Sequence, residues 1–160
     1  MVLEEYKQKR KFNVTTEPYP QKKIKKGENR FVVHEHHARK LHWDFRLEMP
    51  QKFNKGYIVL KSWAVPKGIP RRRGIKRLAV ETEDHPVEYI NFKGKIPKGE
   101  YGAGEVEIWD KGKYKNLELR IKNNKLYGLE FELEGEKLKG KYIMIKTNYG
   151  ENNWLIFKSK

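Results

Sequence analysis

Hydrophobic residues in this chain occur in short runs that are rich in β-branched and aromatic side chains. Turn-forming residues separate the runs, and polar and apolar positions alternate with a period of two in the clearest of them. This pattern predicts nine strands, at residues 31–33, 41–47, 57–65, 78–82, 105–109, 117–121, 128–133, 141–146 and 154–157. Turns are predicted at 66–68, 97–99, 102–104, 110–112, 123–124 and 151–153.

So many short strands indicate a mainly β fold: a single-domain antiparallel β-barrel, or closed sandwich, with few short helices. The chain has 160 residues, which is enough for one domain with a full core, and no segment has the composition of a long linker. Residues 1–29 are polar and basic and contain two prolines. We therefore expect residues 30–160 to form the barrel and residues 1–29 to form a basic N-terminal arm, either disordered or lying across the barrel mouth.

Residues 34–46 contain four of the five histidines together with an aspartate and an arginine. His42, Asp44 and Arg46 alternate with apolar residues, so a strand here would carry all three on one face. With His36, this face offers imidazole nitrogen and carboxylate oxygen, which suit manganese, iron or zinc, and a guanidinium that suits an anion. The ordinary alternative is a pair of strand histidines oriented by Asp44, with Arg46 in a surface ion pair.

The other histidines are weaker candidates. His34 and His37 are predicted to lie outside a metal's ligand set, because His37 would point away from His36 and His34 would only continue the polar face. His85 lies at or just beyond the end of strand 78–82 and is, taken alone, a turn residue before proline. The basic pair at 76–77 and Tyr89 raise its interest as part of an anion site. The glycine-rich run 97–104 lacks a Walker pattern, so we interpret it as a tight turn or bulge.

Charge favours a polyanionic partner. There are 36 Lys and Arg residues against 21 Asp and Glu, a formal charge of +15, and the excess is spread along the whole chain. Nucleic acid is favoured over a membrane because the chain has no long apolar run, no basic amphipathic helix and no signal-peptide pattern. Adaptation to heat is an alternative source of such a composition. The absence of cysteine excludes disulfides and thiolate metal sites, and a cytoplasmic protein fits best.

Several motifs together resemble a known family. They are His36-x-Ala-x-x-Leu-His42-Trp-Asp44-Phe-Arg46-Leu, Lys61-Ser-Trp-Ala-Val-Pro-Lys67-Gly, Arg77-Leu-Ala-Val, Glu83-Asp-His85-Pro, Ile96-Pro-x-Gly-x-Tyr-Gly-Ala-Gly104 and Val106-x-Ile-Trp-Asp110-x-Gly. In this order and spacing, they resemble the 3′-phosphoesterase module of bacterial and archaeal DNA ligase D, over nearly the whole chain. The resemblance implies a manganese-dependent enzyme of strand-break repair that heals DNA 3′ ends. It would cleave a terminal 3′ ribonucleoside to leave a 3′-phosphate and then remove that phosphate.

By position, the resemblance assigns the metal ligands to His36, His42 and Asp44. Manganese is the implied cofactor, and zinc or cobalt would also suit such ligands. The groups expected around the scissile phosphate are Arg10, Arg46, Lys67, Arg77, His85 and Tyr89, with acidic contributors at Glu17 and Glu83. Two residues depart from the family pattern: Lys11 stands where Asp is usual, and His34 where Gln is usual. Lys11 makes retention of the ribonucleoside-releasing step the less secure expectation.

For the mechanism, a divalent ion with Arg46 and Arg77 would stabilise the charge that develops on the phosphoryl oxygens, and water acidified by the ion is the hypothesis for the nucleophile. His85 would either position the phosphate or protonate the leaving 3′ oxygen. The expected substrate is primer–template DNA. A ligase and a polymerase are the expected partners in trans, and the protein is expected to be a monomer. A non-catalytic nucleic-acid-binding barrel and a phosphoesterase for RNA 3′ ends are the alternative functions.

Overall fold

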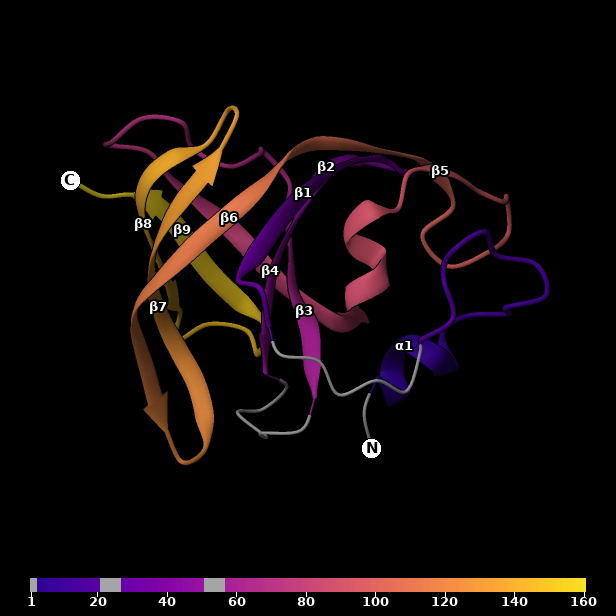
Figure 1. The fold of residues 1–160 in the computed structure, drawn as a ribbon, viewed down its shortest axis with the longest axis horizontal. Helices are drawn as coiled ribbons and strands as arrows, with labels where there is room; N and C mark the ends of the chain where they lie inside the picture. The colour runs from indigo at the N-terminus through magenta and orange to yellow at the C-terminus, as the bar shows by residue number, and fades with distance from the viewer. Residues whose placement is uncertain (1–2, 21–26, 51–56) are drawn as a thin grey trace.

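The computed structural model describes residues 3–20, 27–50 and 57–160 (Figure 1). The described residues form one α-helix, one 3-10 helix and nine strands. In chain order these are α1 (Glu4–Gln8), β1 (Arg30–His37), β2 (Leu41–Pro50), β3 (Ile58–Val65), β4 (Lys76–Pro86), η2 (Val87–Asn91), β5 (Gly94–Ile96), β6 (Gly104–Lys122), β7 (Lys125–Gly135), β8 (Lys139–Lys146) and β9 (Asn153–Lys158).

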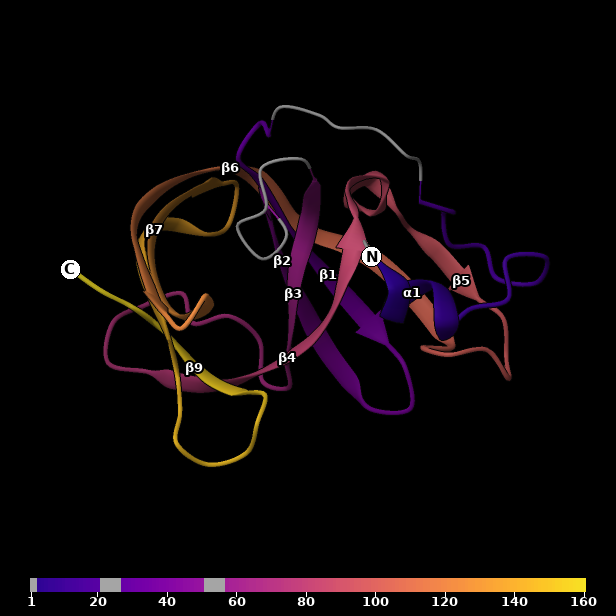
Figure 2. The same cartoon turned by 90° about the horizontal axis from the view of Figure 1, so that it is seen from below.

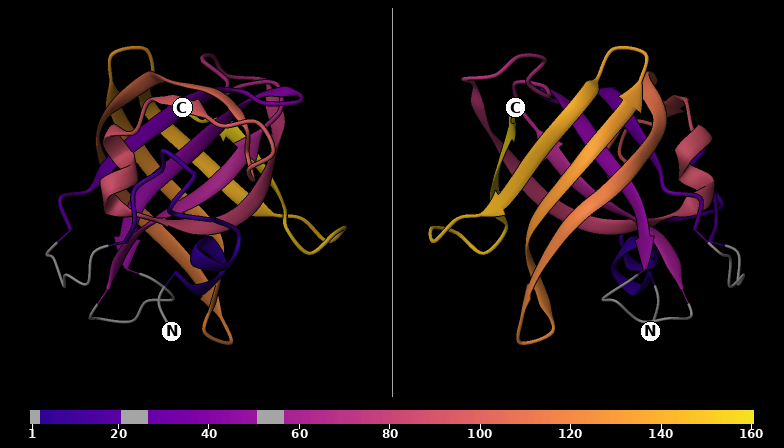
Figure 3. Two further views of the ribbon diagram at one scale, coloured as in Figure 1. Left: turned by 90° about the vertical axis from the view of Figure 1, so that its right-hand side faces the viewer. Right: turned by 60° about the vertical axis from the view of Figure 1, so that its left-hand side comes forward.

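The strands form one antiparallel sheet that closes on itself. Its order is β1-β2-β3-β4-β9-β8-β7-β6, and a further pairing between β1 and β6 completes the ring. Figure 3 shows the strands slanting across the wall of this barrel, as closure requires. The predicted mainly β antiparallel barrel with very few helices is therefore confirmed.

Strand β6 is long enough to serve two parts of the molecule. Its first half pairs with β1 on one edge and with the short β5 on the other, so that Val106 lies opposite both His36 and Gly94. Its second half pairs with β7 in a hairpin that projects beyond the barrel in Figure 1. Asn123 and Asn124, both at positive φ, form the hairpin's turn, as expected from the residues that tolerate this backbone conformation.

The two faces of β1, β2 and β3 belong to different cores. Alternate residues such as Val33, Phe45 and Trp63 point into the barrel, where they are fully buried in the main hydrophobic cluster. The outward face is covered by a second cluster, which contains side chains from α1, η2 and β5. Figures 1 and 2 both place these three elements together on one side of the barrel. This covered outer face, and not the barrel mouth, carries the polar residues of β1 and β2.

The N-terminal arm packs onto that outer face. Tyr6 of α1 is fully buried, and its hydroxyl donates a hydrogen bond to the carbonyl of Pro18. Burial of one such side chain stabilises the docked arm by about 2 kcal/mol. Residues 3–20 are therefore ordered and cover the outer face of the barrel. This corrects the expectation of an arm that is disordered or lies across the barrel mouth. Residues 21–26 of the predicted arm lie outside the described residues.

Three local predictions were wrong. The turn predicted at 110–112 is continuous strand within β6, where the Asp110 carboxylate accepts backbone N–H groups from the β7–β8 turn. Gly112 there lies too close to the carbonyl of Glu134 to carry a side chain. The strand predicted to end at 82 continues to Pro86, so His85 is a strand residue opposite Leu60. The short β5 was not predicted.

Among the described residues, no helix is long and apolar enough to cross a membrane.

Candidate metal and phosphate site

A recess of about 290 Å³ opens on the covered outer face of the barrel. Its floor comes from β1 to β4, and its walls come from the arm, η2 and the turn after β5. The residues that line it are Arg10, Glu17, His36, Ala38, His42, Asp44, Arg46, Ala64, Thr82, Glu83, His85, Tyr89, Ile96, Tyr101 and Gly102. The structure thus gathers all the predicted site residues except Lys67 and Arg77.

His36, His42 and Asp44, hereafter the triad, lie together because β1 and β2 pair in register. His36 is directly opposite His42 across the hairpin, and Asp44 is two residues further along the same face of β2. His36 Nδ1 lies 3.1 Å from Asp44 Oδ2, and His42 Nε2 lies 3.2 Å from Asp44 Oδ1. One ligand atom from each residue falls within 4.8 Å of the others, a spacing that one divalent ion can bridge.

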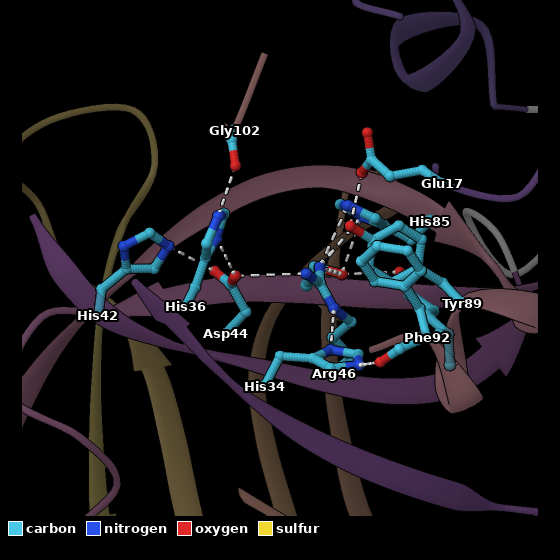
Figure 4. Close-up of polar contacts among 12 residues, drawn as sticks. Glu17, His34, His36, His42, Asp44, Arg46, His85, Tyr89, Phe92 and Gly102 are labelled. Atoms are coloured by element: carbon cyan, nitrogen blue, oxygen red, sulfur yellow. Dashed lines mark hydrogen bonds and ion pairs between the residues drawn. The ribbon is translucent and has the colours of Figure 1, made fainter. Parts of the chain in front are cut away.

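Backbone carbonyls fix the orientation of both imidazoles. His36 Nε2–H donates to the carbonyl of Gly102 at 2.6 Å (Figure 4), and His42 Nδ1–H donates to the carbonyl of Lys40 at 3.0 Å. Because a carbonyl only accepts, these nitrogens carry the protons of the neutral rings. The opposite nitrogens face Asp44: in the neutral rings they carry the lone pairs that can bind a metal, and when protonated they donate hydrogen bonds to the Asp44 carboxylate. Metal-bound histidines in proteins are held in this way, so the residues fit a divalent cation.

The charge of the triad also suits a cation. Burial acts to raise the pKa of Asp44, but Arg46 and the hydrogen bonds from His36 and His42 hold it well below its usual range. The carboxylate is therefore ionised. Burial acts to lower the pKa of His42, but the hydrogen bond to Asp44, the charge of Asp44 and the hydrogen bond to the carbonyl of Lys40 together raise it. A cation bound beside Asp44 would displace the protons that His42 otherwise attracts.

Arg46 occupies the centre of the recess with its side chain almost fully buried. Its Nε donates to His34 Nδ1 at 3.1 Å, its Nη1 donates to Ser62 Oγ at 2.9 Å, and its Nη2 lies 3.3 Å from Asp44 Oδ2. These contacts hold the guanidinium beside the triad in a single orientation. A fixed guanidinium next to a cation site is suited to a phosphate group.

His85 lies on the other side of Arg46 (Figure 4). Its Nδ1–H donates to the carbonyl of Glu83 at 2.9 Å, so the lone pair of the neutral ring is on Nε2, which lies 3.4 Å from Arg10 Nη2. Burial, followed by the charges of Arg46 and Arg10, lowers the pKa of His85 well below its usual value. His85 is therefore a neutral imidazole between two guanidinium groups.

The arm contributes a buried ion-pair network. Arg10 Nε lies 2.9 Å from Glu17 Oε1, and Arg10 Nη1 lies 3.2 Å from Glu83 Oε2. The Tyr89 hydroxyl donates to Glu17 Oε2 at 2.5 Å, and burial first, then the charge of Glu17 and this bond, raise the pKa of Tyr89 despite the nearby arginines. This network attaches the arm to β4 and η2. It also places the guanidinium of Arg10 at the edge of the recess.

The remaining predicted residues lie elsewhere. Lys67 and Arg77 line a different recess at the mouth of the barrel, on the opposite face of the sheet from the triad. His37 is exposed and turned away from His36, as expected, and pairs with Glu35. Lys11 is exposed outside the recess.

Sequence reasoning missed several contributors. His34 is fully buried and orients Arg46, Ser62 supports it from β3, and Gly102 supplies the carbonyl that orients His36. Thr82 also lines the recess, and its Oγ1 is buried without a hydrogen-bond partner among the described residues. Of these features, the sequence marked His34 and the glycine-rich turn, and both were interpreted as ordinary structural features.

Comparison with known proteins agrees with this geometry. Residues 34–146 match the family model described as the DNA ligase D 3′-phosphoesterase domain. The chain belongs to this family. The chain is similar to the multifunctional non-homologous end joining protein LigD of Mycolicibacterium smegmatis, which is 44% identical over 165 residues, covering 99% of this chain and 20% of that protein.

LigD of Pseudomonas aeruginosa is 43% identical over 162 residues, covering 99% of this chain and 18% of that protein. The multifunctional non-homologous end joining DNA repair protein LigD of Mycobacterium tuberculosis strain H37Rv is 43% identical over 159 residues, covering 99% of this chain and 20% of that protein. This chain therefore spans about a fifth of the length of these relatives. The family resemblance inferred from the motifs is confirmed.

Proposed function

We propose that this chain is a divalent-metal-dependent phosphoesterase that removes 3′-phosphates from DNA ends. The observation that carries the proposal is the triad, in which two imidazoles oriented by backbone carbonyls and one ionised carboxylate converge beside the buried guanidinium of Arg46. A barrel that only bound nucleic acid would need basic and aromatic surface, but not a preoriented cation site next to a fixed arginine.

His36 Nδ1, His42 Nε2 and Asp44 would hold the ion, with manganese proposed and zinc or cobalt as candidates for the same ligands. A bound divalent ion would supply a Lewis acid for a phosphoryl oxygen. Nothing in the ligand types selects one metal, because imidazole and carboxylate suit most first-row divalent ions. The hydrogen bonds that the two rings donate to the carbonyls of Gly102 and Lys40 would keep both rings in place as the ion binds.

The chain's own cations would bind and orient the phosphate. Arg46 and Arg10 flank the space in front of His85, and Thr82 lines the same recess. A phosphate dianion placed there would offset the two guanidinium charges that keep His85 neutral. Substrate binding would thus favour a protonated His85 Nε2, which is the form needed to protonate a leaving 3′ oxygen.

The relatives' names place LigD in non-homologous end joining, and we propose the same pathway for this domain. Primer–template ends are the proposed substrate, and ligase and polymerase activities would act on the healed end. Removal of a terminal ribonucleoside is proposed as a second activity. Lys11, one of the two residues that depart from the family pattern, is exposed and does not line the recess, whereas Arg10 and Glu17 of the arm do.

The test is incubation of the purified protein and manganese with a 3′-phosphate primer–template, its RNA counterpart, and a primer that ends in a single ribonucleotide. Phosphate release from the DNA substrate supports the proposal, and release from the RNA alone would replace it with RNA end healing. No release from any substrate, with every divalent metal tried, would leave a non-catalytic barrel.

The histidine assignment is tested by His42→Ala. We expect it to abolish turnover, by at least about 1,000-fold, together with manganese retention in equilibrium dialysis. The matched control is His37→Ala, which removes an exposed imidazole from the opposite face of the same hairpin and should change neither. Full activity in His42→Ala would remove the triad from the mechanism.

A further inference from the structure

A second recess, of about 320 Å³, lies at the mouth of the barrel. The loop between β3 and β4 forms one side of it, and Trp43 of β2 and Trp109 of β6 form the other. Its polar and aromatic lining consists of Trp43, Lys67, Arg71, Arg72, Arg77 and Trp109. It shares no residue with the triad recess, but Trp43 lies between His42 and Asp44 in the chain and points to the other face of the same strand.

The loop is held in a fixed shape around this recess. Arg77 Nη1 donates to the carbonyls of Lys67 and Gly68, at 2.9 Å and 3.0 Å. Gly68 adopts a positive φ of 85° and packs against the indole of Trp43, where an added Cβ would lie 3.5 Å from the ring. Arg77 thus positions the backbone of the loop at Lys67 and Gly68. The basic side chains of the loop extend from this fixed backbone.

The recess is lined by four cationic side chains and no acidic side chain. No carboxylate among the described residues lies within ion-pair distance of Lys67, Arg71, Arg72 or Arg77. Lys137 adds a further cation 5.2 Å from the ring of Trp109. Elsewhere among the described residues, Arg10, Arg30, Arg46 and Arg120 have acidic partners, whereas Arg39 and Arg73 have none within ion-pair distance. Cations that the protein leaves without acidic partners around a concave surface are complementary to an anionic ligand.

The two indoles distinguish the ligand from a free anion. Trp43 and Trp109 are half-buried and packed on the barrel core, so each is rigid and leaves part of its ring at the surface. A base can stack on such a ring only if it is not enclosed in a duplex, and every base can do so. Arginines for the backbone beside aromatic rings for the bases are the combination that binds single-stranded nucleic acid.

We propose that this recess binds a single-stranded segment of DNA that adjoins the 3′ end in the triad recess. The part about the 3′ end rests on the proposed function, whereas single-strand binding does not. The β1–β2 hairpin separates the two recesses, because His42 and Trp43 are consecutive residues on its two faces. A strand that passes the tip of this hairpin would contact both. Lys67 and Arg77 then serve the neighbouring strand, away from the scissile phosphate.

The test is fluorescence anisotropy with catalytically inert probes that end in a 3′-hydroxyl: oligothymidylate, a blunt duplex, and a primer–template with a single-stranded extension. We expect the extension to tighten binding about tenfold over the blunt duplex. Arg71→Ala/Arg72→Ala should abolish this gain. The matched control, Lys122→Ala/Lys125→Ala, removes the same charge from exposed residues at the β6–β7 turn and should keep the gain.

Trp109→Leu separates stacking from charge, and its thermal unfolding shows whether the barrel is intact. A folded Trp109→Leu variant that loses the gain supports a base-binding recess. An equal loss on blunt and extended DNA in Arg71→Ala/Arg72→Ala, or no difference from the control pair, would overturn the proposal. Phosphate release by the wild-type protein is measured separately, so failure of the proposed phosphoesterase activity is distinguishable from failure of this binding site.

Discussion

Arg46 links the triad to the rest of its recess through a complete set of directional contacts. Its guanidinium reaches His34, Ser62 and Asp44, and its Cζ lies 4.8 Å from the centre of the Tyr89 ring. A buried cation is costly unless it is paired and hydrogen-bonded, and here each nitrogen has a partner. The arrangement therefore fixes the guanidinium before any substrate arrives, which is the condition under which a charge stabilises a transition state effectively.

Arg46→Lys tests whether this geometry matters beyond the charge. A lysine ammonium cannot reproduce the planar fork that reaches three partners at once, so we expect phosphate release to fall by at least about 100-fold. Manganese retention should be unchanged, because Arg46 is not a proposed ligand. The measurement is single-turnover kinetics with metal binding by dialysis. A rate within about threefold of wild type would show that a point charge is sufficient there.

The residues that the sequence identified are those with chemistry visible in their type and spacing. The alternation of His42, Asp44 and Arg46 indicated one strand face, and the structure confirms that face. His34 followed the same alternation but was interpreted as ordinary, because its partners, Arg46 and the carbonyl of Phe92, are distant in sequence. Gly102 contributes only a backbone carbonyl, which no residue-type pattern can reveal.

At the scale of elements, Asp110 shows how one side chain can join three strands. It lies in β6, opposite β1, and its buried carboxylate accepts the N–H groups of Glu136, Lys137 and Leu138 at 2.9, 3.2 and 2.9 Å. These are the backbone donors of the tight turn between β7 and β8. The Asp-x-Gly pattern predicted a turn at 110–112. Its aspartate, Asp110, instead lies within β6 and caps the turn between β7 and β8.

We therefore predict that Asp110→Ala lowers the free energy of unfolding by about 3 kcal/mol, since three backbone donors lose a charged acceptor in a buried position. Asp110→Asn keeps one acceptor oxygen and should lose less. Urea denaturation measures both, and turnover under native conditions should remain near wild type because Asp110 is outside the triad recess. A loss below about 1 kcal/mol for Asp110→Ala would mean that water replaces the carboxylate at this turn.

Element prediction succeeded where local pattern decides structure. Strands β1 to β4 and β6 to β9 each contain a predicted run, because alternating apolar residues and turn signals are local properties. The three-residue β5 was missed since its strand character comes from pairing with β6. Docking of the arm was also beyond local pattern, because it depends on Tyr6 entering a pocket formed by distant residues and on Arg10 meeting Glu83.

At the scale of the whole molecule, the barrel supports two recesses, one on each side of the β1–β2 hairpin. Its interior is apolar and closed, so the chemistry is placed on the outside of the wall. The arm, η2 and β5 then build a second layer that buries the polar groups enough to fix their geometry. Burying histidines beside arginines in this layer has a measurable consequence for stability.

Two histidines of the layer should make the metal-free protein sensitive to acid. Burial, and next Arg46, lowers the pKa of His34 to about 3, and His85 is also held well below its usual value by burial and the same arginine. In the unfolded chain both titrate near 6.5, so below that pH the unfolded state binds protons that the folded state excludes. Their contribution is complete above about pH 6.5 and is lost progressively as the pH falls towards the folded-state values.

We predict that the free energy of unfolding in EDTA falls by about 2–5 kcal/mol between pH 6.5 and pH 4.5, at a slope of about 1.4 kcal/mol per pH unit for each histidine. His42 acts in the opposite direction, because its raised pKa adds stability at low pH. The expected fall in the free energy of unfolding is therefore smaller than the sum of the contributions of His34 and His85. Urea denaturation across this range measures the slope. His34→Gln removes one titrating group and should reduce the slope by about 1.4 kcal/mol per pH unit, whereas the exposed control His37→Gln should not. Equal slopes in wild type and His34→Gln would show that His34 is protonated in the folded protein. His34 Nδ1 could then not accept the hydrogen bond from Arg46.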